Sequence, residues 1–165
     1  MTDQTPLEPP QVPRLNVPRL GEMGLANYAP YLMNRIMGRY NASLREEMGQ
    51  LGLSTPKMRA LAVLSVIEGP LIGELAVYAV VEQSTLSRAL DQLAAEGLIR
   101  READAADSRA TRVFITAAGR ARFETLWPTM AEAHARMFRG VSEDERRAFV
   151  GTLQKMLANI RRHEI

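Results

Sequence analysis

The chain has 165 residues, 46% of them hydrophobic and 24% charged, with a formal net charge of +2, which fits one globular domain with an appendage. Cysteine is absent, so disulfides, thiolate metal sites, cysteine nucleophiles and thiol-based redox switches are excluded. The two histidines, His134 and His163, lie too far apart in sequence for a helical two-histidine metal motif, and we expect neither a metal nor a cofactor.

Residues 1–26 are predicted to form a proline-rich N-terminal arm. Proline removes amide donors and favours extended backbone, so this segment does not fit a core element. Its short repeat Val-Pro-Arg-Leu leaves two interpretations open: packing on a partner subunit, or a simple tail. The segment lacks the basic-then-apolar order of a secretory signal, and no apolar run reaches the roughly 18–20 residues that span a bilayer. We therefore expect a cytoplasmic protein with no membrane partner.

A long amphipathic helix is predicted over residues 27–49. Apolar side chains recur along it at three-to-four spacing, at Leu32, Met33, Ile36, Met37, Tyr40, Leu44 and Met48. A second helix is predicted to start at Thr55-Pro56, with the threonine hydroxyl as cap and proline at the first helical position. Its nearly continuous apolar sequence indicates a buried helix, which Gly69-Pro70 ends.

Two short helices then form a predicted helix-turn-helix, over Leu71–Ala79 and Glu82–Gly97. Only Val80 and its neighbours are left to make the turn. On the second of these helices, the inward face is formed by Leu86, Leu90 and Leu93. The same geometry turns a set of small polar residues and one arginine outward over the first turns: Ser84, Thr85, Ser87 and Arg88.

A two-stranded wing follows, with strands predicted over Leu98–Glu102 and Thr111–Thr116 and a small polar tip between them. Thr116 is predicted to cap the next helix, and Ser142 with Glu145 to form a capping box for the last one. The expected fold is mainly α with a small β-wing: a winged helix-turn-helix flanked by N- and C-terminal helices.

This order of elements resembles the MarR family of winged-helix transcription regulators. The residues that carry the resemblance are ELAVYAVVEQSTLSRALDQLAAEGLIRR, the wing segment Asp107-Ser108-Arg109, and VFITAAGRARF after it. Each string is weak alone, but in this order over some 140 residues they are specific. One departure is Val80, at a turn position where many helix-turn-helix proteins carry glycine.

The resemblance implies a MarR-type domain over 27–165, with its winged helix-turn-helix at about 55–116 and dimerisation helices at about 27–49 and 117–162. It further implies a homodimeric transcriptional regulator, expected to be a repressor, whose two recognition helices enter successive major grooves of a pseudo-palindromic operator. The long apolar stripes of the first and last helices independently favour a dimerisation region, because a monomer this small would not cover them fully, and ordinary core packing explains the other part of them.

Double-stranded DNA is therefore the expected partner, and the sequence offers a definite set of contacts. Of the basic residues only Lys57 and Lys155 are lysines; the rest are arginines, whose planar fork suits phosphates and guanine edges, although a GC-rich genome would also favour arginine codons. Arg109 is expected to enter a minor groove, with Asp107 holding it. The full predicted contact set is Gln83, Ser84, Thr85, Ser87, Arg88, Arg100, Asp107, Arg109 and Arg112.

Release by a small aromatic or anionic effector is the mode of regulation that the composition and the family leave open. The side chains predicted to line such a site are Arg35, Arg59 and Trp127. Two alternatives remain: a DNA-binding protein without a ligand, and a winged helix used as a protein-interaction module. An enzyme is not expected, because the sequence has no phosphate-binding glycine loop and no nucleophile with its base.

Overall fold

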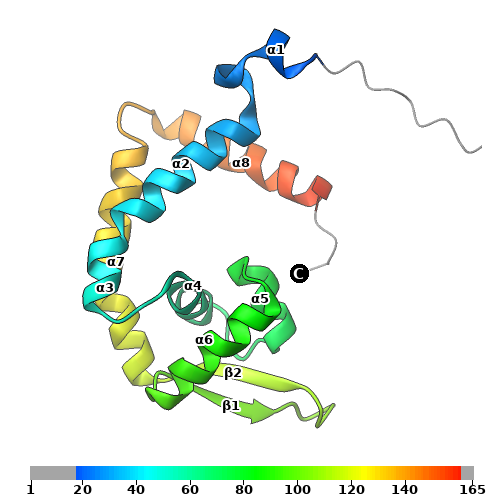
Figure 1. Ribbon diagram of the computed structural model, residues 1–165, viewed down its shortest axis with the longest axis vertical. Helices are drawn as coiled ribbons and strands as arrows, with labels where there is room; N and C mark the ends of the chain where they lie inside the picture. Colours follow the sequence, from blue (N-terminus) through cyan, green and yellow to red (C-terminus); the bar gives the residue numbers. More distant parts are fainter. Residues whose placement is uncertain (1–17, 161–165) are drawn as a thin grey trace, which may run out of the picture. The chain divides into compact units, whose positions relative to one another are not determined.

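A computed structural model describes residues 18–160; residues 1–17, most of the predicted arm, and residues 161–165, which include His163, lie outside the described part. The elements are α1 (Leu20–Met23), the 3-10 helix η1 (Leu25–Asn27), α2 (Ala29–Ser43), α3 (Arg45–Gln50), α4 (Thr55–Leu64), α5 (Ile72–Ala79), α6 (Gln83–Ala95), β1 (Ile99–Ala103), β2 (Thr111–Ile115), α7 (Ala117–Met137) and α8 (Glu143–Ile160). Figure 1 labels the α-helices and the strands. This composition confirms the expected fold class, mainly α with a small antiparallel wing. The chain divides into two compact units, with the boundary between Met37 and Gly38 inside α2.

The prediction of one unbroken helix over 27–49 is wrong, because the structure divides it at Leu44. There the Leu44 amide donates to the Asn41 carbonyl at 3.4 Å, a tighter turn than the α-helical bond. The Ser43 hydroxyl donates to the Tyr40 carbonyl at 2.7 Å and so competes with the regular ladder. Leu44 itself is fully buried, so the break places its side chain in the core.

The core of the larger unit is built around α4, which packs against α5, α6, α7 and β2. Leu61 and Leu64 of α4 meet the inward face of α6, where Leu86, Leu90 and Leu93 are completely inaccessible to solvent. Burying a leucine side chain fully contributes roughly 1.5–3 kcal/mol, so this face fixes how α6 lies on α4. The start of α4 differs from prediction by one residue: Ser54 is the N-cap, no hydroxyl caps the helix, and Thr55 is the first helical residue.

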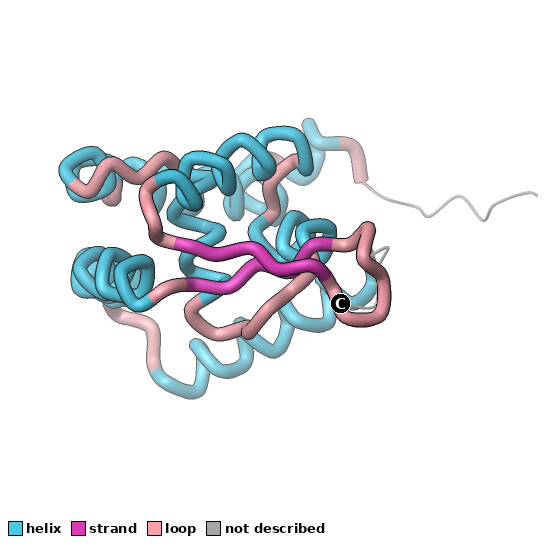
Figure 2. The backbone as a smooth tube through the Cα atoms, turned by 90° about the horizontal axis from the view of Figure 1, so that it is seen from below, coloured by secondary structure: helices cyan, strands magenta, loops and turns pink. Residues whose placement is uncertain are grey.

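The wing is an antiparallel hairpin in which Ile99 pairs with Ile115 and Ala103 with Thr111. Figure 2 shows its two strands twisting about each other toward the tip. The fully buried Val113 anchors the hairpin in the core, and its amide donates to the Pro70 carbonyl at 3.0 Å.

The predicted caps of the last two helices are confirmed. Thr116 accepts a bond from the Gly119 amide at 3.1 Å through its hydroxyl oxygen, and the same hydroxyl donates to the Gly97 carbonyl at 2.8 Å. At the start of α8 the Ser142 amide donates to a Glu145 carboxylate oxygen at 2.8 Å, and the Glu145 amide donates to the Ser142 hydroxyl at 3.3 Å. These bonds satisfy amides that a helix start leaves without partners.

Gly119 is required by a close approach, which gives a first prediction. A Cβ at this position would lie 2.0 Å from the Leu98 carbonyl oxygen, so Gly119→Ala must displace α7 from the wing. We expect a loss of about 1–3 kcal/mol of unfolding free energy, measured by urea denaturation. The control is Gly73→Ala on α5, where nothing lies within 4 Å and alanine is the better helix former. Equal unfolding midpoints for the two variants would contradict the close approach.

Candidate nucleic-acid interface

The first turns of α6 present an exposed polar surface on the side opposite its buried leucines. Gln83, Ser84, Thr85 and Arg88 are exposed, and Ser87 is half-buried. The spacing explains this, because Leu86 and Leu90 direct one face of the helix inward and leave the intervening positions in solvent. The five predicted contact residues of this helix therefore lie together at its N-terminal end.

Glu82 caps α6 through its side-chain carboxylate. Its carboxylate accepts a bond from the Thr85 amide at 3.1 Å, and the Ser84 hydroxyl also donates to it. These bonds, first that from the Ser84 hydroxyl, lower the pKa of Glu82. Glu82 therefore engages the Ser84 hydroxyl. For the side-chain hydroxyls of Thr85 and Ser87, no carboxylate partner is found among the described contacts.

The turn before α6 adopts a strained backbone at Val80. Its φ of 52° and ψ of 51° are left-handed, and Val80 is the single non-glycine residue with positive φ in residues 18–160. This conformation costs an ordinary residue about 1–2 kcal/mol, and the branched Cβ of valine makes it an outlier. The carbonyl of Val80 accepts a bond from Arg59 Nη1 at 2.9 Å, so Arg59 contacts the turn.

The tip of the wing is organised by two aspartates. One carboxylate oxygen of Asp104 accepts bonds from the amides of Ala106 and Asp107, at 2.9 and 3.0 Å. Asp107 in turn accepts bonds from the backbone amide and the Nε of Arg109, at 3.0 and 3.3 Å. The side chain of Arg109 remains 92% exposed, so it projects from a tip whose backbone is held in place.

The other wing arginines are engaged with the protein itself. Arg112 donates to Asp104 at 2.5 Å and to the Gly69 carbonyl at 2.7 Å, which ties the wing to the loop before α5. Arg101 donates to Asp91 of α6 at 2.8 Å, and Arg100 forms an ion pair with Glu102. Among the predicted contacts of the wing, Arg109 is thus the guanidinium most available to an external anion.

The comparisons with known proteins agree with this geometry. A model of the MarR family matches residues 51–110. The chain is 64% identical to a MarR-family transcriptional regulator from Silicibacter pomeroyi, whose crystal structure superposes with a TM-score of 0.86 over 90% of this chain and 100% of that one. The chain belongs to the MarR family.

Other relatives of this MarR-family protein are named as regulators. It is 26% identical over 140 residues to the HTH-type transcriptional repressor IacR of Pseudomonas putida, covering 85% of this chain and 81% of the relative. It is 30% identical over 138 residues to the transcriptional regulator HosA of Escherichia coli O157:H7, covering 82% and 98%. A structure of Bordetella bronchiseptica BpsR, described with the regulation of its DNA binding by 6-hydroxynicotinic acid, is 25% identical over 77% of this chain and 96% of that one, with a TM-score of 0.67.

This MarR-family protein is therefore a DNA-binding transcriptional regulator, and its relatives are regulators and not enzymes. Across residues 18–160 no group of three acidic or histidine side chains is arranged to hold a metal ion. Within the same range no helix is long and apolar enough to cross a membrane.

The three side chains predicted to line an effector site each contact different residues. Arg35 donates to the Tyr31 hydroxyl at 3.0 Å within the N-terminal unit. Arg59 is bonded to the Val80 carbonyl, as described above. Trp127 is 56% exposed on α7, with its ring centroid 6.4 Å from that of Phe123. No described contact joins Arg59 to Trp127.

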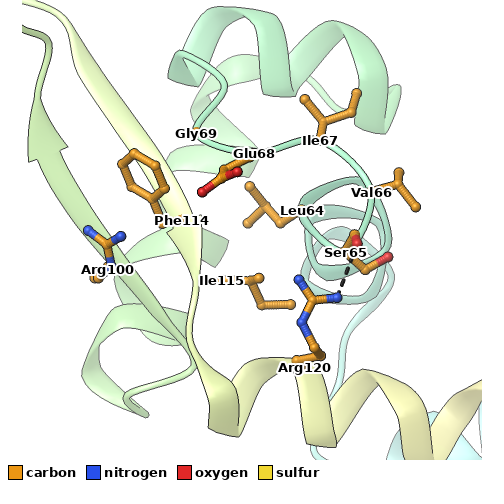
Figure 3. Close-up of a pocket in the computed structure, with 10 residues that line it drawn as sticks. All are labelled: Leu64, Ser65, Val66, Ile67, Glu68, Gly69, Arg100, Phe114, Ile115 and Arg120. Carbon is orange, nitrogen blue, oxygen red and sulfur yellow. Dashed lines mark hydrogen bonds between the residues drawn. The ribbon is translucent and has the colours of Figure 1, made fainter.

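A cavity of about 320 Å³ lies at the base of the wing of this MarR-family protein, between the loop after α4, β2 and the start of α7 (Figure 3). Both arginines that line it have partners. The Arg100 guanidinium lies 4.2 Å from the centre of the Phe114 ring, and Arg120 donates to the Ser65 carbonyl at 3.1 Å. The contacts of Arg100 and Arg120 stabilise the base of the wing. Neither contact was predicted from the sequence.

The Asp104 carboxylate gives a prediction for the wing tip. Bonds from the Asp107 and Ala106 amides, followed by Arg112, lower the pKa of Asp104 below its ordinary value of 3.8. Its stabilising contribution is therefore present above pH 3.8 and is lost as the pH falls through the lower value of the folded state. We expect the Ala106 and Asp107 amide resonances to shift together over that range in an NMR titration.

Asp104→Asn should give the released amide positions already at neutral pH, because an amide is a weaker acceptor than a carboxylate. Glu124→Gln, which removes an exposed carboxylate from α7, serves as the control and should leave the tip resonances unchanged. Tip resonances that are the same in Asp104→Asn and the wild type would contradict this account of the wing.

Proposed function

We propose that this regulator binds a pseudo-palindromic operator as a homodimer, with α6 of each protomer in a major groove and the wing beside it. The observation that carries the proposal is the placement of the polar first turns of α6: they are exposed while the leucines behind them are buried. A helix held in this way can enter a groove without disturbing the core.

The exposed side chains of α6 suit different chemical groups of the DNA. Gln83 suits the paired donor and acceptor of an adenine edge, and Arg88 suits guanine or a phosphate. Thr85 and Ser87 are short enough to bond phosphate or base edges without holding the helix out of the groove. Ser84, whose hydroxyl is bonded to Glu82, contributes mainly through its small size.

In the wing, Arg109 is proposed to enter a minor groove, with Asp107 orienting it. Arg112 supports the wing from behind through Asp104 and Gly69, and its role is to position Arg109. Arg100 can contact a phosphate only if its ion pair with Glu102 breaks. An exposed, anchored arginine at the tip favours DNA over the alternative of a protein-interaction module.

The homodimer is proposed from the apolar residues that α8 leaves in solvent. Five of them are exposed: Phe149, Val150, Met156, Leu157 and Ile160. Most of them share one helix face, and α2 carries exposed Leu32 and Ile36 as well. Apolar stripes of this kind are covered in stable proteins, and a second copy of the same chain is the partner that the family relationship supports.

We also propose that the protein is a repressor released by a small aromatic or anionic ligand. Curated relatives are named repressors, and the BpsR structure is described with 6-hydroxynicotinic acid as a regulator of DNA binding. Arg35 and Trp127 remain proposed ligand contacts. Arg59 also stays in that set; its described hydrogen bond is to the Val80 carbonyl, as that of Arg35 is to Tyr31. The regulator then acts in the cytoplasm, by binding and not by catalysis.

The DNA contacts are tested by Arg88→Ala and Arg109→Ala. Each should weaken binding to the operator by roughly 1–3 kcal/mol, because each removes a guanidinium from the groove. The measurement is fluorescence anisotropy with a duplex that the wild-type protein selects from a random library. Arg136→Ala, which removes an exposed arginine paired only with Glu132 in the described contacts, is the matched charge control. Wild-type affinity in both variants would show that DNA binds elsewhere.

The dimer is tested by Leu157→Glu. Leu157 is 62% exposed in the single chain, and a carboxylate there would be buried against the partner, so we expect dissociation to monomers in sedimentation velocity. Lys155→Glu changes charge on the opposite side of the same helix and should leave the dimer intact. A wild-type protein that sediments as a monomer at micromolar concentration would contradict the proposal.

A further inference from the structure

We propose that Arg59 is a positioning residue for DNA recognition, which holds the strained turn at Val80 and so fixes the direction of α6. The proposal rests on the DNA-contacting surface of α6 described under Proposed function. It assigns a role to a side chain whose described hydrogen bond is to the backbone of the turn before α6.

The turn between α5 and α6 has the hydrogen-bond pattern of a Schellman motif. The Val81 amide donates to the Ala76 carbonyl at 3.1 Å, and the Val80 amide donates to the Val77 carbonyl at 3.2 Å. This motif places its left-handed residue where Val80 stands, a position that glycine usually fills. Val80 is 76% exposed, so burial of its side chain does not offset the unfavourable backbone.

Arg59 supplies the compensating bond from outside the turn. It lies on α4, twenty-one residues earlier in the chain, and its Nη1 reaches the Val80 carbonyl at 2.9 Å. A hydrogen bond from a charged donor is stronger than one between neutral groups, and a cation also interacts favourably with the carbonyl end of a helix. The bond therefore favours the conformation that the valine itself disfavours.

The same helix, α4, also holds the other end of α6. Lys57 forms an ion pair with Glu96, the C-cap of α6, at 2.5 Å, and the side chain of Lys57 is only 8% exposed. Because Lys57 and the buried Leu86 remain in place, loss of Arg59 should leave α6 packed on α4 and change only the turn that sets the direction of its N-terminal end. That end carries Thr85 and Arg88, so the expected consequence is a recognition helix that is folded but incorrectly aimed.

Positioning can be separated from direct contact with DNA by the salt dependence of binding. If Arg59 contacted a phosphate, its removal would lower the slope of log affinity against log salt by about one for each guanidinium lost. A positioning residue leaves that slope unchanged, because the number of phosphates neutralised in the complex stays the same.

The experiment combines Arg59→Ala with Val80→Gly in the full-length protein, using anisotropy on the selected operator duplex. Arg59→Ala should weaken binding about tenfold with the wild-type salt slope. Val80→Gly alone should bind like the wild type, because glycine adopts the left-handed turn without strain. In the double variant most of the lost affinity should return, since the turn no longer depends on the arginine.

Three further variants accompany the experiment. Arg136→Ala should bind like the wild type. If Arg59→Ala is unfolded by circular dichroism, Arg59→Lys replaces it, and its smaller loss should likewise be restored by Val80→Gly. Wild-type affinity after removal of Arg59, a double variant no better than the single one, or a reduced salt slope would each overturn the proposal. If instead Arg88→Ala binds like the wild type, the DNA-contacting surface itself has been assigned wrongly.

Discussion

Three successive helices of this protein end at a carbonyl that accepts a hydrogen bond from an arginine of another element. Arg122 donates to Leu51 at the end of α3, Arg120 to Ser65 at the end of α4, and Arg59 to Val80 at the end of α5, at 2.7, 3.1 and 2.9 Å. A helix leaves its last carbonyls without internal partners and concentrates partial negative charge there. A guanidinium satisfies both needs at once, and so connects each helix end to its neighbour.

These contacts separate the arginines into two groups with different roles. One group stabilises the frame: Arg59, Arg101, Arg112, Arg120 and Arg122 are bonded to carbonyls or carboxylates of another segment of the chain. The other group projects into solvent from that frame, with Arg88 on α6 and Arg109 at the wing tip. The specificity of a recognition surface depends on such a frame, because a misplaced helix loses its base contacts together.

Local patterns predicted most of the candidate site. The leucines of α6 recur with helical spacing, so the exposure of Thr85 and Arg88 follows from periodicity. The wing tip follows from its short polar sequence, in which Asp107 is two residues from Arg109. The cap of α6 was not predicted: Ser84 and Thr85 have the hydroxyls usual at a helix start, yet the Glu82 carboxylate, a stronger acceptor, makes the bond.

The sequence by itself determined the helix periods, the wing and the caps at Thr116 and Ser142, since each depends on residues a few positions apart, and it indicated the family through the order of its motifs along the chain. Only the tertiary structure decided what Arg59, Arg120 and Arg122 do, because their acceptors lie 21, 55 and 71 residues away. A backbone carbonyl carries no side-chain signature, so nothing in the sequence marks which one an arginine will reach. The left-handed conformation of Val80 was not predicted either: the sequence showed only a valine where many helix-turn-helix proteins carry glycine, and a contact from a distant helix maintains the conformation.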